Sequence, residues 1–413
     1  MNEQHIHPAL LRGLTHRRVG RRGLIQLFGA AGAGLALSAC GIQNKKAPPS
    51  RPGEVQRFWA DKRKKGHLNF ANWPLYMDPK HPQLKKFTAA TDIKVTYREV
   101  IQDNAPWFAK IQLRLAAGRS IGYDLMVMTN GIQFSQLVEL GYLAPLDHAK
   151  LPNFAKYAGE KYKGQTFDPG NVYSIPWTSG MTGIGYNPKY VKVPPTTIAD
   201  LWDPQYKGRV GMMDDTQEIG NFAMLLDGID PEESGVDEWA KAADRLKSQR
   251  AMGIVRKYYG ADYIDPLTNG EIWLTMAWSG DIFQQNTSKG TNLKFVLPEE
   301  GATIWTDNMI IPKTAKSPVD AIMLMNFFYD PVIAAGLTEY INYVTPVPST
   351  RDIIRAEAAK ATGAARQALE QVADSPLVYP SDSDYANLRS YRRFENSRER
   401  QEYQSIFQPI IQQ

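Results

Sequence analysis

The sequence predicts an α/β protein with two lobes and strands that cross between them at a hinge. At 413 residues, the chain exceeds the roughly 250–300 residues at which a single hydrophobic core stops growing, so we expect more than one lobe. Its 43% hydrophobic and 11% aromatic content is typical of an ordered globular protein. From residue 66 onward, strand-like and helix-like segments alternate, which indicates α/β layers.

The first predicted elements after residue 66 are two strands and two helices. The segments HLNFANW (67–73) and IKVTYREV (93–100) carry apolar residues at every second position, which indicates strands. Between them, HPQLKKFTAA (81–90) has apolar residues at helical spacing. The next helix, DNAPWFAKIQLRLAAG (103–118), begins with a good cap and ends at Gly118.

The next segments include the predicted hinge. YDLMVMTN (123–130) is a predicted buried strand, and GIQFSQLVELGYL (131–143) a predicted helix. YSIPWTSGMTGIGYN (173–187) is expected to form a strand pair rich in glycine, since small residues allow the backbone rotation that a hinge requires. Two further segments, 298–307 marked by glycine and 342–350 rich in proline, are also expected to pass between the lobes. We therefore expect three crossings in total.

These crossings divide the chain into two discontinuous lobes. Lobe 1 is expected to comprise residues 66–182 and 303–350, and lobe 2 residues 183–302 and 351–413. No repeat with a period of 20–50 residues is present, which argues against a solenoid.

Residues 1–40 have the layout of a signal peptide. The apolar stretch 24–39 follows two arginines and is too short and too rich in glycine for a comfortable membrane span. RRGLI (21–25) resembles the twin-arginine export motif, and LSAC (37–40) resembles the lipobox, in which cleavage leaves a lipidated cysteine. A short membrane-anchoring helix is the alternative. A lipid on Cys40, the single cysteine, would hold the protein on the outer face of the cytoplasmic membrane.

Residues 41–65 are predicted to be a flexible basic tether, because KKAPPSRPG (45–53) is polar and rich in proline. The positive charge of the chain lies in the signal peptide and this tether. The whole chain has a formal net charge of +5, but residues 66–413 have −5. A protein that binds nucleic acid needs its basic residues on the folded surface that meets phosphates, so we exclude that class.

Motifs of most catalytic, phosphate-binding and metal sites are missing from the sequence. It contains no GxGxxG after a strand, no Walker loop, no GxSxG and no HExxH. The last of its six histidines is His148, which leaves little material for a metal site or a Ser-His-Asp triad. We therefore expect no metal, no cofactor and no catalytic residues.

The remaining candidates for functional residues are acids that stand near aromatic residues in the sequence. Asp215 and Glu218 stand in the first turn of a predicted helix, a position that the helix dipole alone would favour. In TIWTDNMIIP (303–312), Trp305 and Asp307 share one face of a predicted strand, because side chains two residues apart point the same way.

Trp278, at the end of a predicted strand, and Tyr343, in a predicted loop, add two aromatic residues that could also be ordinary core residues. Together with the acids they suit an organic cation, because an ammonium group stripped of water needs carboxylates and ring faces. A desolvated cation–π contact contributes about 2 kcal/mol, and a charged hydrogen bond about 1.5–3 kcal/mol. Such contacts suffice for the roughly −8 kcal/mol of a micromolar complex.

At these residues the chain resembles the substrate-binding proteins of spermidine/putrescine ABC importers. The resemblance spans Leu68 to Gln408 and implies a two-lobed, periplasmic-binding-protein-like clamp of type II. Such a clamp closes on a linear polyamine and then docks a membrane permease, as a monomer and without enzymatic activity. The markers occur in family order, as NFANWPLY, YDLMVM, YSIPWTSGMTGIGYN, ADLWDPQYKGRVGMMDD, TNGEIWLTMAWSGD, TIWTDNMIIP and INYVTPVPST.

The resemblance also implies which residues contact the ligand. Two departures affect one end of the pocket. Pro74 and Leu75 replace a hydroxyl residue and an acid that spermidine binders tend to have, and MTNG (128–131) lacks an aromatic wall. The length of the polyamine is therefore left open. The implied aromatic walls are Trp73, Tyr76, Trp278, Trp305 and Tyr343, the acids are Asp215, Glu218 and Asp307, and further polar contacts come from Thr129 and Gln408.

Three other functions stay open. A binding protein of the same fold for ferric iron or another amine is one, since Tyr258 and Tyr259 resemble paired tyrosine ligands. An extracellular hydrolase with Asp215, Glu218 or Asp307 as general acid and base is another. A surface adhesin is the third.

Overall fold

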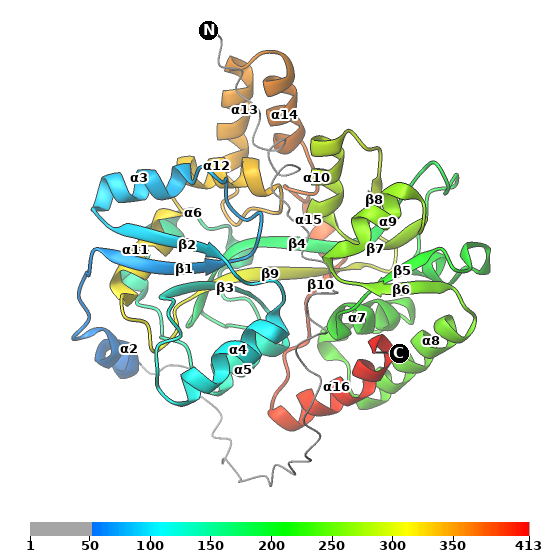
Figure 1. Ribbon diagram of the computed structural model, residues 1–413, viewed down its shortest axis with the longest axis horizontal. Coiled ribbons are helices and arrows are strands. Elements are labelled where there is room, and N and C mark those ends of the chain that lie inside the picture. Colours follow the sequence, from blue (N-terminus) through cyan, green and yellow to red (C-terminus); the bar gives the residue numbers. More distant parts are fainter. Residues whose placement is uncertain (1–51, 413) are drawn as a thin grey trace, which may run out of the picture.

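A mixed sheet runs through the molecule and carries both lobes (Figure 1). The strands are β1 (His67–Asn72), β2 (Lys94–Glu99), β3 (Leu125–Thr129), β4 (Ser174–Tyr186), β5 (Val210–Met213), β6 (Val255–Tyr259), β7 (Leu274–Trp278), β8 (Lys294–Val296), β9 (Ala302–Ile310) and β10 (Leu388–Arg389). The computed structural model describes residues 52–412. Its strand order is β2-β1-β3-β9-β4-β7-β5-β6, with β10 paired to β9 and β8 to β4. The predicted α/β class is confirmed, and we call the half built on β1–β3 lobe 1 and the half built on β5–β7 lobe 2.

Lobe 1 places its parallel strands between two groups of helices. Alternate residues of β3 face the two sides: Leu125 and Val127 belong to one buried cluster, and Met126 and Met128 to another. The first cluster includes residues of α3, α11 and α12, and the second includes residues of α4 and α5. The helices of this lobe are α2 (Pro52–Trp59), α3 (Pro82–Thr91), α4 (Asn104–Ala116), α5 (Ile132–Glu139), α6 (Pro152–Tyr157), α11 (Pro318–Phe327) and α12 (Pro331–Ile341).

Lobe 2 has its own core, to which α7, α8 and α16 contribute large buried side chains. Phe222, Trp239 and Tyr403 are each at most 2% exposed and belong to one cluster. The strands β5, β6 and β7 run parallel to one another beside this cluster. The helices of this lobe are α7 (Thr216–Leu226), α8 (Val236–Ala251), α9 (Ile264–Asn269), α10 (Ser279–Lys289) and α16 (Ser397–Ile411).

The strand β4 joins the two lobes as one continuous crossing. It pairs with β9 along its first part and with β7 and β8 near its C-terminal end. The predicted strand pair over 173–187 is therefore wrong. Its glycines serve close packing and not a turn: a Cβ on Gly180 would lie 2.2 Å from the ring of Trp305. An irregularity between Pro176 and Thr178 shifts the register of the strand.

The chain crosses the lobes again at β9 and β10, and β10 was not predicted from the sequence. After α12, Val344 forms a bridge to Ser179 of β4, and the chain enters a helical hairpin that projects from the top of the molecule in Figure 1. The hairpin packs against α12, and β10 follows it along β9. The lobe boundaries given above stay predictions. The hairpin helices are α13 (Thr350–Lys360) and α14 (Gly363–Ala373), and α15 (Asp382–Ala386) precedes β10.

The helix α2 corrects part of the predicted flexible tether. Trp59 is 7% exposed and its Nε1 donates to the carbonyl of Pro145 at 2.8 Å, while Val55 and Phe58 pack on the core of lobe 1. The apolar residues stand at the i, i+3, i+4 spacing of an amphipathic helix, and this pattern outweighs the proline-rich, basic composition. The predicted signal peptide, Cys40 and residues 41–51 of the tether lie outside the described residues.

None of the helices described between residues 52 and 412 has by itself the length and hydrophobicity of a membrane span. The pair α11 and α12 reaches that length and composition only together, across a bend of 82°. Most residues of both helices are buried in the core of lobe 1, as in a helix pair of a folded protein interior.

Candidate ligand-binding site

The acid Asp307 lies in the middle of the sheet, where β9 runs between β3 and β4. Its partners in register are Thr129 and Thr178, and its side chain is 1% exposed. Thr129 Oγ1 donates to Oδ1 at 2.7 Å, and the hydroxyl of Tyr76 donates to Oδ2. Burial raises the pKa of Asp307 to about 6, although the two hydrogen bonds favour the ionised form. Burial also keeps the pKa of Tyr76 well above its usual value, so Tyr76 stays a donor.

The indole of Trp305 lies beside this acid because β9 meets the glycine-rich strand β4. Trp305 pairs with Gly180, whose missing side chain leaves the space that the indole ring fills. The indole Nε1 donates to Thr182 Oγ1 at 3.2 Å and the side chain is 5% exposed, so the ring is fixed. Trp305 and Asp307 share one face of the strand, as the period of two predicts.

A second buried acid, Glu218, stands in the first turn of α7. Three donors converge on its Oε1: the hydroxyl of Thr182 at 2.6 Å, that of Tyr391 at 2.8 Å and the indole of Trp278 at 3.2 Å. Its Oε2 is buried and has no hydrogen-bond partner among the described residues. Burial, and then the neighbouring charge of Asp215, raise the pKa of Glu218 to about 7.

The third acid, Asp215, is the N-cap of α7. Its Oδ1 accepts from the backbone N–H groups of Gln217 and Glu218 at 2.7 and 3.1 Å, which is the helix-cap role that its position also allowed. Its side chain is exposed to solvent. Partial desolvation raises the pKa of Asp215 to about 6, although the two backbone N–H groups favour its ionised form.

A row of aromatic rings connects the two buried acids. The ring centroids of Trp278 and Trp305 lie 6.4 Å apart, those of Trp305 and Tyr343 5.3 Å apart, and those of Tyr343 and Tyr76 6.4 Å apart. The indole N–H of Trp278 is bonded to Glu218, and the hydroxyl of Tyr76 is bonded to Asp307. Flat apolar faces with a carboxylate at each end suit a flexible molecule that carries a positive charge at each end.

Sequence reasoning missed two members of this site. Tyr391, in the loop after β10, reaches Glu218, and Asp281, in the first turn of α10, accepts from the hydroxyls of Tyr343 at 3.0 Å and Tyr263 at 3.1 Å. Asp281 follows Trp278 by three residues and could have been found in the TMAWSGD segment. No sequence signal indicates Tyr391, because its position depends on the path of β10.

The structure does not bring two of the residues predicted to contact the ligand, Trp73 and Gln408, to the row of rings. The indole of Trp73 donates to the carbonyl of Val127 at 3.2 Å and packs in lobe 1. Gln408 lies on α16, whose Tyr403 and Phe407 press against Gly220 of α7. No hydrogen bond of the described residues joins Gln408 to an acid of the site, and its contact with one end of the ligand stays a prediction.

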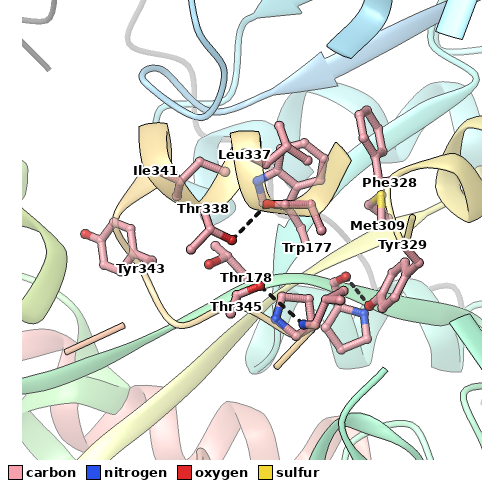
Figure 2. Close-up of a pocket in the computed structure, with 14 residues that line it drawn as sticks. Trp177, Thr178, Met309, Phe328, Tyr329, Leu337, Thr338, Ile341, Tyr343 and Thr345 are labelled. Atoms are coloured by element: carbon pink, nitrogen blue, oxygen red, sulfur yellow. Dashed lines mark hydrogen bonds between the residues drawn. The ribbon is translucent and has the colours of Figure 1, made fainter. Parts of the chain in front are cut away.

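Two cavities elsewhere lack the chemistry of a cation site. A cavity of about 20 Å³ is lined by residues of β4 and α12 and by Tyr343. Figure 2 shows these side chains between the strand and the helix. That volume holds about one water molecule and no diamine. A groove of about 580 Å³ between α10 and the end of α14 has no carboxylate in its lining. We therefore keep the candidate site at the row of rings.

The paired tyrosines considered for ferric iron do not converge. Tyr258 and Tyr259 are neighbours on β6, so their side chains point to opposite faces of the strand. Arg250 lies over the ring of Tyr258 at 6.0 Å, and Lys257 over that of Tyr259 at 4.6 Å, where a cation would be repelled. Within residues 52–412, no group of three or more His, Cys, Asp or Glu side chains could hold a metal ion.

Comparison with known proteins gives consistent similarities. The family model described as bacterial extracellular solute-binding protein matches residues 83–367. The spermidine/putrescine-binding periplasmic protein of Escherichia coli (strain K12) is 33% identical over 297 residues, which cover 71% of this chain and 81% of the relative. The putrescine-binding periplasmic protein SpuD of Pseudomonas aeruginosa (strain UCBPP-PA14) is 29% identical over 341 residues, which cover 78% and 86%.

A solved structure gives the same result for the fold. The spermidine/putrescine ABC transporter substrate-binding protein PotD from Streptococcus pneumoniae is 25% identical, with a TM-score of 0.69. The alignment covers 83% of this chain and 98% of that protein. The predicted two-lobed binding-protein fold is thereby confirmed.

Proposed function

The chain belongs to the family of bacterial extracellular solute-binding proteins, and from this membership we propose that it captures a polyamine of the putrescine/spermidine class between its two lobes. The bound protein then delivers the polyamine to the membrane permease of an ABC importer. The named relatives that bind spermidine and putrescine support this ligand class.

The observation that carries the proposal is the unpartnered oxygen of Glu218. Its Oε2 is buried without a donor, while three donors crowd on Oε1. A buried carboxylate oxygen without a partner costs about 1–3 kcal/mol or more. A protonated amine would supply the missing N–H and would neutralise the charge, so binding would remove that cost.

The rest of the site supports a long, thin cation. Asp307, at the other end of the row of rings, would receive a second ammonium group, and the methylene chain would lie between the ring faces. Asp215 and Asp281 add negative charge at the rim. Three of the carboxylates come from lobe 2, while Asp307 on the crossing strand β9 is bonded to Tyr76 and Thr129 of lobe 1. A polyamine that contacts both groups would favour the closed form.

The family acts outside the cytoplasm by the description of its model. We extend the proposal to a lipid anchor on Cys40 and a monomeric protein at the outer face of the membrane. Cys40→Ser should then release the protein from the membrane fraction, and persistent membrane association would overturn the anchor.

The proposal assigns the acids to binding and not to catalysis. A hydrolase would need an acid and a base that flank a scissile bond, whereas Asp307 and Glu218 are already engaged by hydroxyl and indole donors along a wall of rings. Turnover of a sugar polymer that is lost in Asp307→Asn would revive the enzyme.

Calorimetric titration with putrescine, cadaverine, spermidine and spermine tests the proposal and also measures the preferred length. We expect micromolar or tighter binding of at least one of them. No heat and no thermal shift from any of the four at millimolar concentration would overturn the polyamine assignment.

A further inference from the structure

The two ends of α5 are completed by side chains from the opposite lobe. α5 belongs to lobe 1, yet the backbone N–H of its first residue, Ile132, donates to Gln217 Oε1 at 2.9 Å. Its last residue, Glu139, accepts from Arg400. Gln217 lies on α7 and Arg400 on α16, and both helices are built into the core of lobe 2.

The contact at the first residue is a helix cap supplied across the interface. The first N–H groups of a helix have no partner within it, so each needs an external acceptor or water. Gly131 makes this possible: a Cβ on it would lie 2.4 Å from Gln217 Oε1, and its φ is +121°. Gln217 is 6% exposed and stands next to Glu218, so this contact forms beside the buried acid.

The contact at the last residue is an ion pair that is mostly shielded from water. Arg400 Nη1 lies 2.9 Å from each oxygen of Glu139, and the two side chains are 6% and 25% exposed. A carboxylate at the C-terminal end of a helix is disfavoured by the helix dipole. The guanidinium of Arg400 offsets this, and only when the two lobes meet.

We propose that Gln217, Glu139 and Arg400 form an interlobe latch that sets how tightly the protein holds its ligand. The cap and the ion pair both join lobe 1 to lobe 2, so a movement that separates α5 from α7 and α16 would return both contacts to water. A ligand that binds the closed form has an apparent affinity that falls with the closed population. Weakening the latch therefore weakens binding although no latch residue touches the ligand. The choice of ligand rests on the proposed function, but the latch does not.

Titrations of Glu139→Gln and Arg400→Gln with putrescine and spermidine test the latch. We expect roughly threefold to tenfold weaker binding in each variant, mainly through faster dissociation. The exchanged pair, Glu139→Arg with Arg400→Glu, should recover most of the affinity, because it restores the ion pair with the charges reversed. Glu399→Gln is the matched control, because Glu399 lies on the same helix as Arg400 but pairs with Arg392, which precedes that helix, and not with lobe 1. It should leave the affinity unchanged.

Wild-type affinity in both single variants, or an equal loss in Glu399→Gln, would overturn the latch. A second measurement does not need a ligand. Hydrogen exchange at the amide of Ile132 in the ligand-free protein should be slower in the wild type than in Glu139→Gln, because the closed form protects it. Equal exchange rates would also overturn the latch. If the wild type bound none of the amines, the polyamine proposal would fail while this exchange experiment still decided the latch.

Discussion

The two buried acids of the site differ in how their oxygens are occupied. Asp307 and Glu218 are both 1% exposed, and both have a raised pKa. At Asp307 each oxygen accepts one hydroxyl, from Thr129 and from Tyr76. At Glu218 all three donors share Oε1 and Oε2 has none. The unequal satisfaction, and not the burial, indicates where an incoming donor contributes most.

Replacing the less satisfied acid should have the largest effect. We expect Glu218→Gln to weaken spermidine or putrescine binding about 100-fold at pH 8, because it removes a charge and turns an amide N–H toward the ammonium group. Calorimetry measures this directly. Glu160→Gln, at an exposed carboxylate paired with Lys163, is the control and should bind as the wild type does. A loss of affinity smaller than threefold in Glu218→Gln would contradict the claim that the unpartnered oxygen of Glu218 contributes most to binding.

Lowering the pH should weaken binding next most strongly, and mainly through Glu218. The amine requires ionised carboxylates, so affinity falls as pH drops through about 7 and then about 6. From pH 8 to pH 6 we expect a loss of roughly twentyfold.

Stability of the ligand-free protein should change in the opposite direction. A carboxyl group whose pKa is higher in the folded state than in the unfolded state stabilises the fold at pH values below its unfolded-state pKa. This stabilisation is lost as the pH rises to the folded-state pKa. For Glu218 the loss lies between about 4.5 and about 7. The rise in melting temperature caused by spermidine should therefore grow with pH, and a constant rise from pH 5 to pH 8 would contradict the raised values.

Replacing the better satisfied acid should cost less. Asp307→Ala is expected to weaken amine binding by at least tenfold and to leave the protein folded, because Thr129 and Tyr76 keep hydroxyls that can face the ligand. Calorimetry and thermal melting together measure both effects. Unchanged affinity would remove Asp307 from the site, and a loss greater than that of Glu218→Gln would reverse the comparison.

The smallest effect should come from one of the donors to Glu218. Tyr391→Phe leaves Oε1 with Thr182 and Trp278, so we expect binding to weaken about threefold and the pH profile to shift to higher pH. Tyr385→Phe is a matched control, because its hydroxyl bonds Tyr162 outside the site. A shift of the pH profile in the control but not in Tyr391→Phe would show that the donor set is wrong.

The sequence predicted those parts of the site that depend on local patterns. The period of two places Trp305 and Asp307 on one face of β9, and the start of α7 carries Asp215 as the N-cap and Glu218 in the first turn. The strands β1, β2, β3, β7 and β9 and the helices α3, α4, α5 and α7 also follow the predicted segments. Period and caps act over a few residues, so one sequence suffices to recognise them.

The parts that failed depend on long-range packing. Tyr391 reaches Glu218 only because β10 runs beside β9, and a two-residue strand leaves no pattern in the sequence. The helix α16, which carries Gln408, packs against α7 and α8, and no sequence pattern indicated these neighbours. The glycines of β4 were expected to allow the rotation of a hinge in a strand pair, whereas Gly180 makes room for Trp305 from another strand. No local rule contains these distant partners.

Proton release on binding tests most directly whether an ammonium group displaces the proton of Glu218. With a pKa of about 7, roughly half of the Glu218 side chains carry a proton at pH 7. Calorimetric titrations with spermidine in two buffers of different ionisation enthalpy should therefore show the release of about half a proton per site at pH 7, about a tenth at pH 8, and almost none in Glu218→Gln. Tight amine binding at pH 7 with the same heat of binding in both buffers would contradict the account.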